Sequence, residues 1–103
     1  MTQPRVYLFD TTAALFAQVI PAGNQGFFVI TPATHNIAND TFVNAYSGTA
    51  ATPANCVGMN ICRVGNDLHT KARTPKPFTN GLYVLAPNNN VNWNVYTWDD
   101  DLN

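Results

Sequence analysis

Side chains suited to catalysis or metal binding are few in this chain of 103 residues, and they are scattered along it. His35 and His69 are isolated from each other, and the spacing of Cys56 and Cys62 is not one that binds zinc. The chain contains no phosphate-binding glycine loop and no G-x-S-x-G, H-E-x-x-H or C-x-x-C motif. We therefore predict that the protein is not an enzyme and holds no metal or other cofactor.

The two cysteines are six residues apart. In one continuous strand, at about 3.3 Å per residue, their Cα atoms would lie about 20 Å apart. A disulfide needs about 5.5–6 Å between these atoms. The spacing therefore predicts free, mostly buried thiols, and a disulfide would require Gly58-Met59-Asn60 to form a tight turn.

The acidic residues are all aspartates. Residues 99–101 form a run of three, but the run lacks the spaced ligands and the glycine of an EF-hand calcium loop. We expect residues 99–103 to form a solvated acidic tail, with a contact to a basic patch on a neighbouring copy as the alternative. Catalysis would require residues that meet only in the fold, such as a histidine beside Asp40, Asp67 or Cys62.

Three of the five basic residues, Lys71, Arg73 and Lys76, lie in one proline-bearing stretch. Nucleic-acid binding favours an excess of basic charge, whereas the formal net charge here is −1. We therefore do not expect a nucleic-acid partner. A contact to an acidic protein neighbour and a plain solvated loop both remain open for these three residues.

The clearest structural pattern is the alternation of side chains near the C-terminus. Side chains alternate across a strand, so one set can line a core while the other faces water or a partner. The first set is Val91, Trp93, Val95 and Thr97, and the second is Asn92, Asn94, Tyr96 and Trp98. With the apolar run 82–86 and the turn residues Pro87-Asn88-Asn89-Asn90, the pattern predicts an antiparallel hairpin over residues 81–98.

The second of these sets combines aromatic rings with amides. Tyr96 and Trp98 beside Asn92 and Asn94 suit a protein interface, where tyrosine and tryptophan are enriched. The same pattern suits a sugar site, because rings stack on apolar sugar faces and amides bond hydroxyl groups. A third interpretation is that this face packs under a second layer of the protein.

The rest of the chain also indicates strands. Runs at residues 5–9, 26–31, 41–46 and 56–64 have strand-like composition, and small-residue or proline-rich loops at 32–40, 47–55 and 70–77 separate them. Residues 15–20 fit a strand paired in a hairpin with residues 26–31, but residues 11–20 also fit one short helix. We predict an all-β fold, a small antiparallel sandwich or barrel of about seven short strands.

Length and composition limit the class of protein to which this chain can belong. The length indicates a single domain over residues 1–103, with a short flexible arm at residues 1–4. Only 11% of residues are charged, and fourteen asparagines and twelve threonines supply the polarity. The apolar run at residues 6–9 is too short for a signal peptide, and no run approaches the roughly 20 apolar residues of a membrane span. We expect cytosolic synthesis without a signal peptide and no membrane partner.

In its low charge and its asparagine-, threonine- and alanine-rich composition, the chain resembles small virion structural subunits, such as shell or decoration proteins of phages. This resemblance implies contacts with further copies of the chain or with a larger protein array, and assembly into a virion. The leading hypothesis is therefore a structural protein that docks through its aromatic face and its edge strands. The alternative is a small glycan- or ligand-binding β module that uses Tyr96, Trp98 and the neighbouring amides.

Overall fold

The computed structural model describes residues 4–33, 40–62 and 75–99. The loop around His35, the turn at residues 65–67 and the acidic tail beyond Asp99 lie outside these ranges. Within them the chain forms eight strands and one short 3₁₀ helix. In chain order these are β1 (Arg5–Phe9), β2 (Phe16–Ile20), β3 (Gly26–Pro32), β4 (Thr41–Ser47), η1 (Pro53–Asn55), β5 (Cys56–Cys62), β6 (Lys76–Phe78), β7 (Leu82–Leu85) and β8 (Trp93–Asp99).

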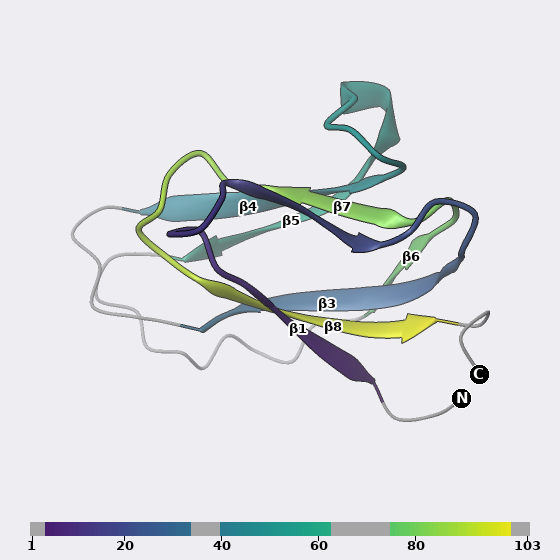
Figure 1. Cartoon of the computed structure of the whole chain (residues 1–103), viewed down its shortest axis with the longest axis horizontal. Coiled ribbons are helices and arrows are strands. Elements are labelled where there is room, and N and C mark those ends of the chain that lie inside the picture. Colours follow the sequence, from purple (N-terminus) through teal and green to yellow (C-terminus); the bar gives the residue numbers. More distant parts are fainter. Residues whose placement is uncertain (1–3, 34–39, 63–74, 100–103) are drawn as a thin grey trace.

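The strands form two antiparallel four-stranded sheets stacked as a β-sandwich (Figure 1). Sheet A has the order β1-β8-β3-β6, and sheet B has the order β2-β7-β4-β5. The predicted all-β fold is thus confirmed as a sandwich. The prediction also placed strands close to their observed bounds at residues 5–9, 26–31 and 41–46.

The predicted hairpin over residues 81–98 is wrong. β7 and β8 belong to different sheets, with β7 between β2 and β4 and β8 between β1 and β3. The connection through residues 86–92 therefore crosses from one sheet to the other, a separation of about 10 Å. Alternation fixes which face of a strand is buried, but it does not fix which strand lies beside it.

The predicted pairing of residues 15–20 with residues 26–31 is wrong for the same reason. β2 pairs with β7, and β3 pairs with β8 and β6. The alternative of a short helix over residues 11–20 is also wrong, because β2 occupies Phe16–Ile20 and a turn precedes it. In that turn the N–H of Ala13 and of Ala14 donates to the Asp10 carbonyl.

The core lies between the sheets and is almost entirely apolar. Fourteen buried side chains form one cluster, and the largest of them is Trp93, with no exposed surface. The predicted burial of the set Val91, Trp93, Val95 and Thr97 is confirmed. Burying a large apolar side chain contributes about 1.5–3 kcal/mol, so this inner layer is the main source of stability.

One strand was not predicted. β6 begins within the stretch 70–77 that the sequence indicates as an extended loop and ends one residue beyond it, and Pro77 is its central residue. Proline has no N–H to give to a ladder, so it occurs in sheets mainly on edge strands. β6 is such an edge, paired only with β3 within the described part of the chain.

Two turns are tied together at one end of the sandwich. The Gly23 N–H donates to the Asn80 side-chain oxygen at 2.7 Å, and the Gly81 N–H donates to the Asn24 carbonyl at 2.7 Å. Gly81 has a φ of +81°, and a Cβ there would lie 2.7 Å from the Ile20 carbonyl oxygen. This position therefore requires glycine.

Candidate functional site

The outer side of sheet A carries a continuous layer of aromatic and aliphatic side chains. Residues directly opposite one another in an antiparallel pair share one face of the sheet. In the register, Tyr96 lies between Val6 and Val29, and Trp98 lies opposite Phe27. We call this surface the aromatic face, and its residues are Val6, Leu8, Phe27, Val29, Thr31, Asn94, Tyr96 and Trp98.

The aromatic face is apolar and open. Val6 is 59% exposed, Leu8 is 55% exposed and Phe27 is 37% exposed, while Tyr96 and Trp98 are half-buried between their neighbours. None of the eight residues of this face is charged. Antiparallel sheets with one solvated side normally alternate apolar residues inside with polar residues outside. Sheet A departs from that rule, because both of its sides are largely apolar.

The outer side of sheet B has the same character. Phe16 is 56% exposed and Met59 is 51% exposed. The Tyr83 ring stacks on Phe16 with centroids 6.1 Å apart and lies 6.4 Å from the Tyr46 ring. We call this surface the second face, and its residues are Phe16, Gln18, Phe42, Asn44, Tyr46, Met59, Ile61, Tyr83 and Leu85. None of these residues is charged.

Three of the residues predicted for an interface share the outward side of β8. Asn94, Tyr96 and Trp98 lie on β8 with half-buried side chains on the aromatic face. The interpretation in which this set packs under a second layer is not what the described residues show, because the second layer covers the other side of the sheet. The residues of β1 and β3 that complete the face had no signal of their own, since the sequence does not show which strands flank β8.

Asn92 has a structural role that the sequence did not indicate. Its side-chain oxygen accepts the Thr11 backbone N–H at 3.0 Å and the Thr11 hydroxyl at 3.1 Å. The same hydroxyl lies 2.9 Å from the Val91 carbonyl oxygen, so its one proton is shared between these two acceptors. Asn92 therefore joins the turn after β1 to the chain just before β8.

Lys76, the one of the three basic candidates that the structure describes, does not join the aromatic face. Lys76 lies on β6 opposite Phe28, whose side chain points into the core. A Cβ added at Gly58 would lie 3.1 Å from the Lys76 Cδ, which places the lysine stem over β5. Lys71 and Arg73 lie outside the described residues.

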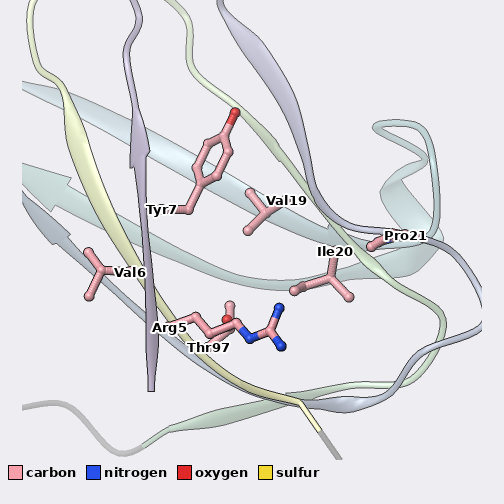
Figure 2. Close-up of a pocket in the computed structure, with 7 residues that line it drawn as sticks. All are labelled: Arg5, Val6, Tyr7, Val19, Ile20, Pro21 and Thr97. Atoms are coloured by element: carbon pink, nitrogen blue, oxygen red, sulfur yellow. The ribbon is translucent and has the colours of Figure 1, made fainter. Parts of the chain in front are cut away.

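An open recess of about 380 Å³ lies where the edge strands β1 and β2 of the two sheets approach each other (Figure 2). Tyr7 and Val19 face each other across it, and Arg5 reaches toward Ile20. Tyr7 has the same parity as the buried Phe9, yet it is 40% exposed. The sandwich is therefore less tightly closed at this side, a feature that the sequence analysis did not predict.

Among the described residues, those considered for chemistry are not assembled into a site. His35, His69 and Asp67 lie outside the described residues, and among the residues that are described no group of three or more histidine, cysteine or acidic side chains is placed to hold a metal ion. Within the same ranges, no helix has the length and apolarity needed to cross a bilayer.

The cysteines are free, as predicted, because β5 runs without a turn from one to the other. Cys62 is buried, and Cys56 is exposed, contrary to the expectation that both are mostly buried. Burial, with a smaller contribution from the negative charge of Asp40, raises the pKa of the Cys62 thiol above its ordinary value. The Cys62 thiol is therefore a protonated core side chain rather than a nucleophile.

Comparison of the chain with protein-family models, with curated proteins and with solved structures finds no match. The two uncharged outer faces and the recess between β1 and β2 are therefore the features from which function must be argued.

Proposed function

We propose that this chain is a structural subunit that associates with further copies of itself through the aromatic face. The observation that carries the proposal is that eight neighbouring outward side chains on sheet A include no charge and expose Val6, Leu8 and Phe27 to water. Exposed apolar surface of this kind, in one contiguous patch, is typical of an interaction site.

The energetics favour a covered face. Val6 and Leu8 are more than half exposed, so burying what remains of each would contribute about 1 kcal/mol, from 1.5–3 kcal/mol for complete burial. The Tyr96 and Trp98 rings add large contact area at little entropic cost and are the residue types that dominate interface energetics. No buried charge has to be desolvated, because the face contains none.

The second face supports an assembly with more than two subunits. It lies on the opposite side of the sandwich and is equally free of charge. A subunit with an apolar surface on each side can be held between neighbours on both sides, as in a protein shell. The compositional resemblance to phage shell or decoration proteins agrees with this arrangement, and a virion subunit is the form of the proposal that we favour.

The test is the mass of the protein in solution between 1 and 100 µM, about the range in which weak specific contacts form. The proposal expects masses that are multiples of the 11.3 kDa chain and rise with concentration. Tyr96→Lys places a charge at the centre of the aromatic face and should abolish the association made through this face, so its mass should be lower than that of the wild type at the same concentration. Leu15→Lys is the matched control, because Leu15 is 38% exposed but lies on neither face. A wild-type mass of one chain throughout this range contradicts the proposal.

A small glycan-binding module is the second candidate. What favours it is that Tyr96 and Trp98 share one exposed face with the Asn94 amide, so that rings for stacking and a group for bonding hydroxyls lie side by side. Tryptophan fluorescence titrated against a panel of glycans separates the two candidates. A saturable shift that is lost in Trp98→Ala would favour glycan binding, and no shift with any glycan would remove it.

A further inference from the structure

The four sheet edges of the sandwich differ in how they are protected. Edge strands expose unpaired N–H and C=O groups, and proteins block them with lysine, proline, bulges or short length. β6 is three residues long and contains Lys76 and Pro77. β2 and β5 each carry an extra residue, Val19 and Val57, where the register with the neighbouring strand shifts.

Of the devices that protect edge strands, β1 has only one charged residue, Arg5, at its first position. Its five residues pair with β8 in one unbroken register, and it contains neither lysine nor proline. Three consecutive residues, Val6, Tyr7 and Leu8, are at least 40% exposed. Alternate N–H and C=O groups of an edge strand point away from its neighbour, and within the described ranges no strand other than β8 pairs with β1.

We propose that β1 pairs antiparallel with β1 of a second copy across a two-fold axis, so that two four-stranded A sheets become one sheet of eight strands. The inference rests on the proposed function, because it adds an edge contact to the self-association proposed for the aromatic face. A pair of five-residue strands in this arrangement forms about four to six backbone hydrogen bonds. The outermost strands of the joined sheet are then the two copies of β6, which are protected, so the pairing stops at two copies.

The sequence of β1 is self-complementary in the antiparallel direction. The register with the longest overlap sets Tyr7 opposite Tyr7 of the second copy, and Val6 opposite its Leu8. The aromatic face then continues across the junction as apolar pairs, the kind that stabilise antiparallel sheets. The two copies of Arg5 end about 13 Å apart, four residues at about 3.3 Å each, which is beyond the screening length of about 8–10 Å, so their charges do not oppose the pairing.

The recess supports the same partner. Tyr7 lines it from β1, and Val19 and Ile20 line it from β2, at the side of the sandwich where a further strand would be added (Figure 2). Neighbouring strands lie about 4.8 Å apart, so the second copy's Tyr7 ring would stand beside the mouth of the recess. By symmetry each copy closes the recess of the other, which accounts for a tyrosine on the inner side of β1 that is 40% exposed in one chain alone.

Cysteine cross-linking tests the register. In a Cys56→Ser background, which removes the exposed thiol, we expect Tyr7→Cys to give a covalent dimer of twice 11.3 kDa under mild oxidation. Cα atoms directly opposite in a strand pair lie about 4.5–5.5 Å apart, within disulfide range. Val6→Cys is the control and should not cross-link with itself, because its copies lie about 8 Å apart in this register. Mixing Val6→Cys with Leu8→Cys should restore the cross-link.

A second variant tests the β1 contact independently of the aromatic face on which the proposed function depends. Tyr7→Lys sets two lysines opposite each other at the β1 edge and leaves the aromatic face unchanged, so the two-chain species that pairs through β1 should be lost. Leu15→Lys should leave it in place. If position 7 does not cross-link and Tyr7→Lys keeps the wild-type mass while Tyr96→Lys does not, the edge contact is wrong and the proposed function stands. If the wild-type chain is monomeric throughout, both are wrong.

Discussion

The two tryptophans of the chain lie on one strand, five positions apart, and they face opposite ways. Trp93 begins β8 and has no exposed surface, because it packs between the sheets. Trp98 lies near the end of β8 and is half-buried on the aromatic face, opposite Phe27 of β3. The inner and outer sides of this strand therefore use the same residue type in two environments.

The comparison shows that apolar character alone does not identify the core of this protein. Both sides of sheet A are rich in aromatic and aliphatic residues, and within the described residues only one of them is covered. The inner side is filled by the opposite sheet, and it stabilises the monomer. The outer side adds little to the fold, and its composition is explained if another subunit covers it.

Trp93→Ala should have the largest effect on stability. Removing a fully buried tryptophan leaves a cavity in the core, and such substitutions cost about 3–5 kcal/mol in the free energy of unfolding. Urea denaturation followed by circular dichroism measures this loss. A cost similar to that of a surface substitution would show that the inner side of β8 is not the core.

Asn60→Leu tests the polar contact that crosses the core. The buried Asn60 amide donates to the Ile30 carbonyl at 2.6 Å, which joins β5 of sheet B to β3 of sheet A. Leucine keeps a similar volume but leaves that carbonyl without this donor, so we expect a loss of about 1–3 kcal/mol. Denaturation of Asn60→Leu beside Ile61→Leu, a substitution of a half-buried neighbour, separates the hydrogen bond from general disturbance of β5.

Trp98→Ala should separate the stability of the single chain from its association with further copies. Its effect on the unfolding free energy of the single chain should be about 0.5–1 kcal/mol, because most of its contacts are with neighbours on an open face. Its effect on association should be much larger, because aromatic residues near the centre of an interface dominate binding. Denaturation at low concentration and light scattering at high concentration measure the two effects; a large loss of monomer stability would place Trp98 in the fold rather than in an interface.

The smallest expected effect is on the pH dependence of stability and comes from Asp10, which lies on neither the aromatic face nor the second face. The Thr12 hydroxyl and N–H donate to its carboxylate at 2.5 Å and 3.0 Å, and these hydrogen bonds lower the pKa of Asp10 below its ordinary value of 3.8. A lowered pKa stabilises the fold above pH 3.8, and this contribution is lost as the pH falls through the folded-state value. The stability difference between wild type and Asp10→Asn should therefore shrink below pH 3.8 and stay constant above it, as measured by thermal unfolding across pH.

The sequence predicted the inner side of the sandwich better than its connections. The alternation around Trp93 identified the buried set of β8. Successive side chains of a strand point to opposite sides, so the apolar set can be placed on the core side in only one way. The pairing of β7 with β8 was wrong, because turn residues such as Pro87 and Asn88 also suit a connection between sheets. β6 was missed because Pro77 argues against a strand except at an edge.

The aromatic face was predicted only in part. Asn94, Tyr96 and Trp98 share one strand, so their common side follows from local spacing. Val6 and Val29 join them from β1 and β3 through pairings that no local pattern shows. The open side of the sandwich at β1 and β2 depends on how the two sheets close, which is a property of the whole fold.

The most direct test of the account follows the environment of Trp98 as copies associate. Trp93→Phe keeps an aromatic ring in the core and leaves Trp98 as the single tryptophan. The fluorescence emission of this variant should shift to shorter wavelength as concentration rises, in step with the mass, because association removes water from the aromatic face. Adding Tyr96→Lys should abolish the shift. An emission maximum that does not change while the mass remains that of one chain would contradict the claim that this face is an interface.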